Sequence, residues 1–519
     1  MADKGDKMRV PSRWLLLLAL LSVSSGAPVP AGAAPEGRMT WAVHASLAPA
    51  WFDPAETTGI STPFMIIYAL HDGLMKPMPG HAMAPSLAES WTVSKDGLTY
   101  DFVLRKGVKF HNGDPLGAED VKFSFERYKG VASATFKAQV AAVDVLDVHR
   151  VRVRLKKPWA DFMTFYATPA TGAAWIVPKN YVERVGDDGF KKAPVGAGPY
   201  RFVSFNPGIE LVLEAYEGYW RKTPSVKRLV FRSVPDESTR LAMLKRGEAD
   251  IVYSIRGALA EELRRTPGLT LKPTLGIFTE WIAMHDQWDP KSPWADRRVR
   301  LAANLAIDRK AINEAEYLGF GKISSTIIPQ DFEFGWAPPP YPYDPARARQ
   351  LLAEAGYPRG FDAGEVFSDM VYVPITEAAA NFLQAIGIRA KLRGLERASF
   401  QKSDLEKKLK PLARVGSSAF GNAATRIEAF VFSTGARAYG GFPDIDGLYQ
   451  EQAGELDPKR RAAILQKIQR LMHERVMFAP LVEPALLNGY GPRVADSGLG
   501  LIAGHLYSAP YEDLKLKDK

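Results

Sequence analysis

Apolar and polar residues alternate along several short segments of this chain. The alternation has a period of two at residues 100–105 and 151–155, and a short apolar run lies at 211–213. A period of two predicts a strand with one buried face. Segments with apolar residues at helical spacing lie between these strands, so the pattern indicates an α/β architecture.

Two helices have clear boundaries in the sequence. Asp344 and Pro345 open the first, because an aspartate caps free N–H groups and a proline suits the first turn, and Gly356 ends it. Asp457 and Pro458 open the second in the same way. The apolar residues at helical spacing are Ala348, Leu351, Leu352 and Ala355 in the first helix, and Ile464, Ile468, Leu471 and Met472 in the second.

The first 33 residues have the order of a secretory signal peptide. Basic residues precede an apolar run at 14–23, and a site of small residues follows at 31–33. The run is too short for a membrane anchor, which needs roughly 18 to 20 apolar residues. We therefore expect cleavage near Ala33 and a periplasmic protein. The chain has no cysteine, so a lipid anchor on a cysteine is excluded.

Composition narrows the class further. The chain has 519 residues, of which 46% are hydrophobic and 11% aromatic, and this is typical of a large globular protein with about three domain-sized units. The absence of cysteine excludes thiol catalysis and thiolate metal ligands. The formal net charge of +9 comes from scattered Lys and Arg, and no run interleaves basic with aromatic residues. We therefore expect no nucleic-acid partner.

The common catalytic motifs are missing from the sequence. His473 and Glu474 are not followed by the second histidine of a zinc-binding helix, and the segment GSSAF at 416–420 lacks the final glycine of a nucleophile elbow. Neighbouring carboxylates such as Asp444 and Asp446 are typical of turn capping. The sequence predicts a protein that is not an enzyme, with no cofactor and no metal bound by its own side chains.

A series of segments, in a fixed order along the chain, resembles the extracellular solute-binding proteins of family 5, the oligopeptide, dipeptide and nickel group. The resemblance covers essentially the whole chain after the leader. The segments that carry it are PSLAESW at 85–91, DGLTY at 96–100, LRKGVKFHNG at 104–113, AEDV at 118–121, GAGPY at 196–200, YW at 219–220, RVR at 298–300, AIDR at 306–309, YDP at 343–345 and LLAEAGY at 351–357.

This resemblance implies a two-lobed periplasmic binding protein of type II, cluster C. Two α/β lobes are joined by two crossing strands, which we expect near 271–285 and 478–490, and a subdomain is inserted in lobe 1. The expected division is a signal peptide at 1–33, a lobe 1 core made of 34–59, 190–277 and 484–519, an inserted subdomain at 60–189, and lobe 2 at 278–483.

The resemblance also indicates where a ligand would bind in lobe 1. In the family, a loop after the first strand contacts the ligand, and Thr57, Thr58 and Gly59 occupy its place here. Their backbone and hydroxyl groups could hydrogen-bond a polar ligand, or the segment could be a simple surface turn. Trp281 lies near the first crossing strand, where it could stack on the ligand or fill the junction of the lobes.

In lobe 2 the sequence departs from the pattern of the peptide-binding members. Those members carry a Trp and an Asp in one loop, and the Asp pairs with the free amino group of the peptide. The matching stretch VGSSAFGN at 415–422 has neither, so its hydroxyl and amide groups suit a neutral, sugar-like or anionic ligand better. The residues expected at the ligand are Gly416, Ser417, Ser418, Asn422, Arg437 and Tyr439, with Arg437 as a partner for an acidic group.

Together these features predict the periplasmic solute-binding protein of an ABC importer. Its lobes would close on a small organic solute, peptide-like or sugar-derived, and deliver it to the permease subunits at the inner membrane. Two alternatives stay open, a receptor for a nickel-type metal chelate and an extracellular hydrolase. We expect a monomer.

Overall fold

The computed structural model of the chain describes residues 34–56, 62–130, 132–167, 171–276, 278–418, 421–502 and 505–517. The expected signal peptide lies outside the described residues. Residues 35–519 form one compact unit, and the structure below is that of this unit alone. No helix in the described ranges is long and apolar enough to cross a membrane.

The first sheet has seven strands in the order β12-β20-β11-β1-β10-β9-β8. Strand β1 runs parallel to β10 and β11, and the other neighbours are antiparallel. Its strands are β1 (Glu36–Val43), β8 (Tyr200–Asn206), β9 (Glu210–Ala215), β10 (Val226–Ser233), β11 (Ile251–Val252), β12 (Thr270–Leu275) and β20 (Ala485–Tyr490), and its helices are α1 (Phe64–Leu70), α6 (Glu237–Lys245) and α7 (Gly257–Arg265).

Successive residues of β1 pack on opposite faces of this sheet. Trp41 lies in one apolar cluster with Phe64 of α1, whereas Ala42 lies in another with Leu263 of α7. Helices therefore cover both faces, which explains why β1 is buried over its last five residues and does not alternate. This sheet is the core of lobe 1.

A four-stranded antiparallel sheet, in the order β4-β5-β7-β6, forms the inserted subdomain. Strands β5 and β7 alternate between buried and exposed side chains, so the expected half-buried strands at 100–105 and 151–155 are confirmed. The elements are β4 (Ala88–Val93), β5 (Thr99–Leu104), β6 (Val140–Asp147), β7 (Arg150–Leu155), α2 (Ala118–Glu126), α3 (Ser133–Gln139), α4 (Phe162–Tyr166) and α5 (Lys179–Lys192), preceded by the hairpin β2 (Met75–Met78) and β3 (His81–Pro85).

Lobe 2 is built on a five-stranded sheet in the order β16-β15-β17-β13-β18. Its strands are β13 (Phe278–Met284), β15 (Phe361–Asp369), β16 (Ile388–Leu395), β17 (Leu412–Ser418) and β18 (Phe478–Pro480). Its helices are α8 (Arg297–Ala306), α9 (Arg309–Tyr317), α10 (Pro345–Glu354), α11 (Val373–Gln384), α12 (Arg397–Leu405), α13 (Ala423–Phe430), α14 (Pro443–Ala453) and α15 (Pro458–Glu474).

Two helix starts in this lobe follow the sequence prediction. The carboxylate of Asp344 accepts a hydrogen bond from the backbone N–H of Arg347 at 2.9 Å, and Asp457 accepts one from Arg460 at 2.9 Å. Each bond satisfies an N–H group that has no partner inside the helix. Gly356 follows α10 with a φ of 93°, a conformation that glycine adopts at low cost. Both predicted helices are thus confirmed.

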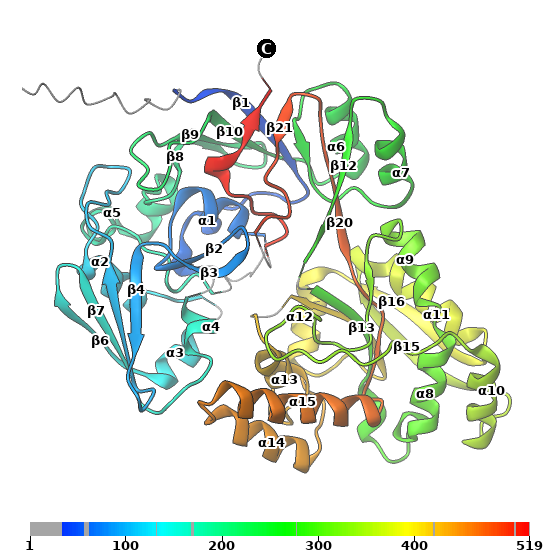
Figure 1. Ribbon diagram of the computed structural model, residues 1–519. Coiled ribbons are helices and arrows are strands. Elements are labelled where there is room, and N and C mark those ends of the chain that lie inside the picture. Colours follow the sequence, from blue (N-terminus) through cyan, green and yellow to red (C-terminus); the bar gives the residue numbers. More distant parts are fainter. Residues whose placement is uncertain are drawn as a thin grey trace, which may run out of the picture. The chain divides into compact units, whose positions relative to one another are not determined.

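The chain passes between the two large sheets twice. Strand β12 pairs with β20 in the lobe 1 sheet, from Thr270 opposite Tyr490 to Leu275 opposite Ala485, and the two run side by side in Figure 1. Strand β13 follows β12 directly and pairs with β18 in lobe 2. The expected crossings are therefore confirmed, while the exact domain limits stay a prediction.

Four histidines, three of them buried and His111 partly buried, are neutral in the folded chain, and this makes stability depend on pH. Burial lowers the pKa of His71, His285 and His505 to about 4 and that of His111 to about 3. In the unfolded chain a histidine binds a proton below a pKa of about 6.5. Stability is therefore full above pH 6.5 and falls as the pH drops toward 4, by about 1.4 kcal/mol per pH unit for each proton taken up.

The measurement is the free energy of unfolding by urea between pH 7 and 5.5. We expect His505→Asn to reduce the slope of stability against pH by an amount that rises from about 0.2 proton at pH 7 to about 0.9 proton at pH 5.5. His81→Asn, at an exposed position of strand β3, should leave the slope unchanged. Equal slopes in the wild type and both variants would contradict the assignment of a buried neutral imidazole to His505.

Candidate functional site

Strands β13 and β17 bring several of the predicted ligand residues together. Thr279 lies opposite Ser417, Glu280 opposite Gly416, and Trp281 opposite Val415. Three residues that the sequence singled out, Trp281, Gly416 and Ser417, are therefore neighbours on adjacent strands. The N-terminal end of β13 is also where the chain enters lobe 2 from lobe 1. We take this pair of strand ends as the lobe 2 side of the candidate site.

A buried ion pair lies beneath these strand ends. The guanidinium of Arg414 donates to the carboxylate of Glu280, and the hydroxyl of Tyr317 donates to the second carboxylate oxygen at 3.1 Å. Glu280 is fully buried and Arg414 nearly so. Burial raises the pKa of Glu280, and the charge of Arg414 opposes that rise. The pair needs both members, because a lone buried charge is costly.

Arg414 also faces aromatic rings at the border of the lobes. Its guanidinium lies 3.6 Å from the ring centre of Tyr372, in the arrangement of a cation–π contact. The next residue back, Val371, accepts a hydrogen bond through its carbonyl from Arg256 of lobe 1 at 3.3 Å. The Nε of Arg414 is buried and has no hydrogen-bond partner among the described residues. Among the described residues, the Nε–H group of Arg414 is therefore a strong hydrogen-bond donor without an acceptor at the border of the lobes.

Gly416 is needed for this arrangement. A Cβ atom at residue 416 would lie 2.7 Å from Cζ of Phe278 and 2.8 Å from Nη2 of Arg414, closer than packed atoms come. A glycine here lets the guanidinium cross over the backbone of β17. The sequence suggested a ligand contact for Gly416, and the structure gives it a steric role as well.

A second buried cation fixes the ends of both strands. Arg426 of α13 is fully buried, and it donates to the carbonyl of Ser417 at 2.6 Å and to the hydroxyl of Thr279 at 2.9 Å. Burial lowers the pKa of Arg426 to about 9. No carboxylate forms an ion pair with it in the described part of the chain. Arg426 thus adds positive charge behind Ser417 while bonding only neutral oxygens.

Trp281, Arg437 and Tyr439 line one small cavity in lobe 2. Its volume is about 20 Å³, which is room for about one water molecule and not for an organic solute. The guanidinium of Arg437 donates to Asp404. The ring of Tyr439 stacks on that of His285, with centroids 3.5 Å apart. In this structure Arg437 therefore already has its acidic partner inside the chain.

Asn422 makes contacts of a different kind from those expected. Its side-chain oxygen accepts from the backbone N–H of Thr425 at 3.1 Å and so caps α13. Its side-chain nitrogen donates to Asp161 of the inserted subdomain. Both ends of the amide are thus engaged within the chain. Ser418 ends strand β17, but its side chain lies outside the described residues, as do Thr57, Thr58 and Gly59.

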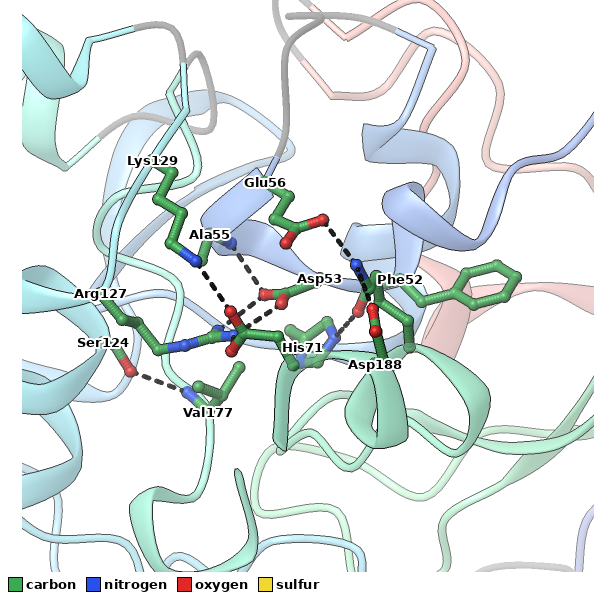
Figure 2. A network of polar contacts seen from close by, with 12 residues as sticks. Phe52, Asp53, Ala55, Glu56, His71, Ser124, Arg127, Lys129, Val177 and Asp188 are labelled. Atoms are coloured by element: carbon green, nitrogen blue, oxygen red, sulfur yellow. Dashed lines mark hydrogen bonds and ion pairs between the residues drawn. The ribbon is translucent and has the colours of Figure 1, made fainter. Parts of the chain in front are cut away.

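The segment that leads to Thr57 is held in place by the polar network of Figure 2. Asp53 is fully buried and accepts two hydrogen bonds from Arg127 of the inserted subdomain, at 2.8 and 2.7 Å. The backbone carbonyl of Phe52 contacts the ring nitrogen Nε2 of His71 at 2.9 Å, and Glu56 pairs with Lys191 at 3.0 Å. These bonds tie the short 3-10 turns at Pro49–Phe52 and Pro54–Glu56 to α5 and to the residue after α2.

Arg127 is the centre of this network because it also pairs with Asp187 at 2.8 Å. Asp187 in turn pairs with Lys129, and the two cations hold the pKa of Asp187 at about 2. The carboxylates of Asp53 and Asp187 raise the pKa of Arg127 against the effect of burial. Arg127, Lys129 and Asp187 therefore stay charged at neutral pH, and their ion pairs persist there.

The described residues contain no group of three or more His, Asp or Glu side chains that could hold a metal ion. A second pocket, of about 190 Å³, lies in lobe 1 between the β2–β3 hairpin and Trp220. Its charged groups pair within the chain, since Lys76 bonds Asp72 at 2.5 Å and Arg105 bonds the carbonyl of Ser86 at 3.2 Å. The strand ends around Arg414 remain the candidate site because three of the predicted ligand residues, Trp281, Gly416 and Ser417, meet there.

Sequence reasoning missed Glu280, Arg414 and Arg426. A trace of Arg414 is present in the sequence, because an arginine stands between the apolar residues of LARV at 412–415. Such a residue in a buried strand needs a partner, but nothing in the sequence identifies Glu280 as that partner. Arg426 lies on a helix whose spacing gives no sign that its guanidinium turns inward.

Two α/β lobes, two crossing strands and polar groups at the lobe border define a two-lobed binding protein. Comparison with known proteins agrees, since residues 82–438 match the bacterial extracellular solute-binding proteins, family 5. The chain belongs to that family. Proteins of this family are the solute-binding components of ABC importers, and this chain is one of them.

The chain is similar to two named relatives. It is 30% identical over 460 residues to heme-binding protein A of Haemophilus influenzae, covering 79% of this chain and 80% of the relative. It is 33% identical over 318 residues to glutathione-binding protein GsiB of Salmonella choleraesuis, and this match spans 60% of each protein.

Two solved structures show the same fold. HbpA2 from Haemophilus parasuis has a TM-score of 0.77 at 25% identity, with 93% of this chain and 100% of that one covered. NikA from Brucella suis in complex with Fe(III)-EDTA has a TM-score of 0.80 at 21% identity, with the same coverage.

Adding one methyl group at residue 416 tests the steric role of Gly416. We expect Gly416→Ala to lower the free energy of unfolding by about 1–3 kcal/mol, because the new Cβ must displace either Phe278 or Arg414. Gly421→Ala is the matched control, since no atom lies within 4 Å of its added Cβ. Urea unfolding of both variants gives the comparison, and similar losses in the two would count against the tight packing at Gly416.

Proposed function

We propose that this chain is the periplasmic receptor of an ABC importer for a small, peptide-like organic solute that carries a carboxylate. The solute is captured between the lobes at the ends of β13 and β17 and passed unchanged to the permease. The buried, unbonded Nε of Arg414 at the lobe border carries the proposal. An arginine donor in that position suits a carboxylate oxygen of a bound solute.

The charge at the strand ends supports an anionic ligand. Arg414 is balanced by Glu280, but Arg426 behind Ser417 has no ion-pair partner in the described ranges. The charge of Glu483 acts on Arg426 without an ion pair between them in the described residues, and a buried cation bonded only to neutral oxygens leaves a positive potential at the nearby backbone. The segment 415–422 contains no carboxylate that could receive a ligand ammonium group.

The relatives support the same class of solute. One protein with 33% identity is named for glutathione and another with 30% identity for heme, and both of these molecules carry carboxylates. Glutathione is a small modified peptide and fits the peptide-like prediction, and its two carboxylates outnumber its one ammonium group, so that its net charge is negative. A receptor needs no catalytic group, because the ligand only has to bind the closed form better than the open form. We therefore propose that the chain is not an enzyme.

A binding panel tests the proposed ligand class. We expect reduced glutathione, or a short peptide with a free carboxylate, to raise the free energy of unfolding by about 2.7 kcal/mol at 100 times its Kd. Glutathione diethyl ester should bind at least about tenfold more weakly, because it offers Arg414 no anionic oxygen. Isothermal titration and urea unfolding are the measurements. Free heme, a sugar acid and Fe(III)-EDTA complete the panel.

A variant separates recognition by Arg414 from general charge. Arg414→Lys keeps the charge that Glu280 requires but removes Nε and the flat guanidinium over Tyr372, so we expect about tenfold weaker binding of the acid form and little change for the ester. Arg389→Lys, at an exposed position of β16, is the matched control. Equal affinity for acid and ester in the wild type, or no binding by any member of the panel, would overturn the proposal.

A further inference from the structure

One carboxylate of the inserted subdomain reaches into lobe 2. Asp161 precedes helix α4 but its side chain does not cap that helix. Its carboxylate instead accepts a hydrogen bond from Nη2 of Arg461 at 2.6 Å, and a second from the side-chain nitrogen of Asn422. These partners lie on α15 and before α13. We name Asp161, Asn422 and Arg461 the interlobe clasp. Arg461 stands 300 positions and Asn422 261 positions from Asp161 in the sequence.

Contacts within lobe 2 hold Arg461 and Asn422 in place independently of Asp161. Arg461 donates to the side-chain oxygen of Gln452 at 3.0 Å, and its guanidinium lies 5.2 Å from the ring centre of Phe334. Asn422 is held by its capping bond to the N–H of Thr425. Both donors therefore point in set directions, which lowers the entropy lost when they bind a carboxylate.

The interlobe clasp is buried and lies next to an apolar contact between the same parts of the chain. The side chains of Arg461 and Asp161 are 6% and 9% exposed, so water screens their attraction only weakly. Leu456, between α14 and α15, lies so close to Gly97 of the inserted subdomain that a Cβ there would be 3.1 Å from it. Both contacts join the inserted subdomain to lobe 2 on this side of the molecule.

Two further carboxylates, those of Glu333 and Glu428, lie near the interlobe clasp. Burial raises the pKa of Glu333 and of Glu428, and the charge of Asp161 adds to both rises. Among these three acids, only Asp161 has a hydrogen bond to Arg461 in the described structure. Within the described ranges, Arg461 is the cation that forms an ion pair with Asp161, and losing either partner leaves the other charge buried without compensation.

We propose that the interlobe clasp sets the balance between closed and open forms, so that Asp161, Asn422 and Arg461 determine ligand affinity without contacting the ligand. In the closed form Asp161 accepts a hydrogen bond from Arg461 and another from Asn422, and in the open form water replaces both bonds. The apparent affinity of a two-lobed receptor is its intrinsic affinity multiplied by the fraction of competent protein. The inference rests on the proposed function only in that closing captures the solute.

The closed fraction can be measured without knowing the ligand. The chain has no cysteine, so Val148→Cys and Tyr343→Cys, which are 69% and 51% exposed, give a specific pair of dye sites in the inserted subdomain and in lobe 2. Single-molecule energy transfer then reports the ratio of closed to open molecules. We expect Asp161→Asn and Arg461→Gln each to lower this ratio at least about tenfold in the ligand-free protein.

Two further variants separate the interlobe clasp from folding. The exchange Asp161→Arg with Arg461→Asp should recover part of the closed population that each single exchange loses, which a folding defect would not do. Arg460→Gln is the matched control, because Arg460 pairs with Glu455 within lobe 2 and is 74% exposed. It should leave the ratio unchanged.

The outcomes are distinct from those of the ligand panel. A wild type with no closed population, or Asp161→Asn with the wild-type ratio, overturns the interlobe clasp. If reduced glutathione leaves the wild-type ratio unchanged while Asp161→Asn lowers it, the interlobe clasp stands and the proposed ligand is wrong.

Discussion

The backbone pairing of β12 with β20 and of β13 with β18 is the constraint on which the rest of this molecule depends. Each crossing segment is bonded into one sheet before the passage and into the other after it. The side-chain nitrogen of Asn488 also donates to the hydroxyl of Thr274, so the two crossings are joined inside lobe 1. Few dihedral angles lie between the bonded parts, and any motion of one lobe against the other must use them.

Buried arginines give lobe 2 the rigidity that such a motion requires. Arg300 donates to the carbonyls of Trp294, Arg475 and Val476, and Arg309 donates to those of Asn304 and Pro480. Burial lowers the pKa of both guanidinium groups to about 10, so they stay charged while they satisfy carbonyl groups that water cannot reach. These hydrogen bonds join helices α8 and α9 to β18 and to the returning crossing. Lobe 2 therefore moves as one rigid body.

Two groups of contacts then lie at the border between the lobes. Arg414, Glu280 and Tyr372 lie beside the crossing strands, and the interlobe clasp lies on the side of the inserted subdomain. Closure brings the second group together, while a ligand is proposed to act on the first. Because the same rotation of one lobe against the other brings the interlobe clasp together and captures the ligand, the free energy of the interlobe clasp adds to that of ligand binding. Ligand affinity is therefore a property of the whole fold.

The sequence by itself determined the elements of this protein. The period-two segments at β5 and β7, and the Asp-Pro starts of α10 and α15, depend on neighbours a few residues away, and local rules are enough to place them. The blocks RVR and AIDR identified the family for a reason now visible, since Arg300 and Arg309 hold the lobe together. The family resemblance in turn supplied the crossings, which no local pattern contains.

Only the tertiary structure decided which polar residues meet. Sequence placed Arg437 as a partner for a ligand acid, but the fold brings Asp404 to it, and it placed Asn422 at the ligand, whereas the fold brings Asp161 to it. Arg414 needs Glu280, which is 134 residues away in the chain. A buried charge is stable only with a partner of opposite charge. For an arginine, any of the chain's carboxylates could be that partner. The partner is the carboxylate that the fold brings near in space, and separation along the sequence does not reveal which one that is.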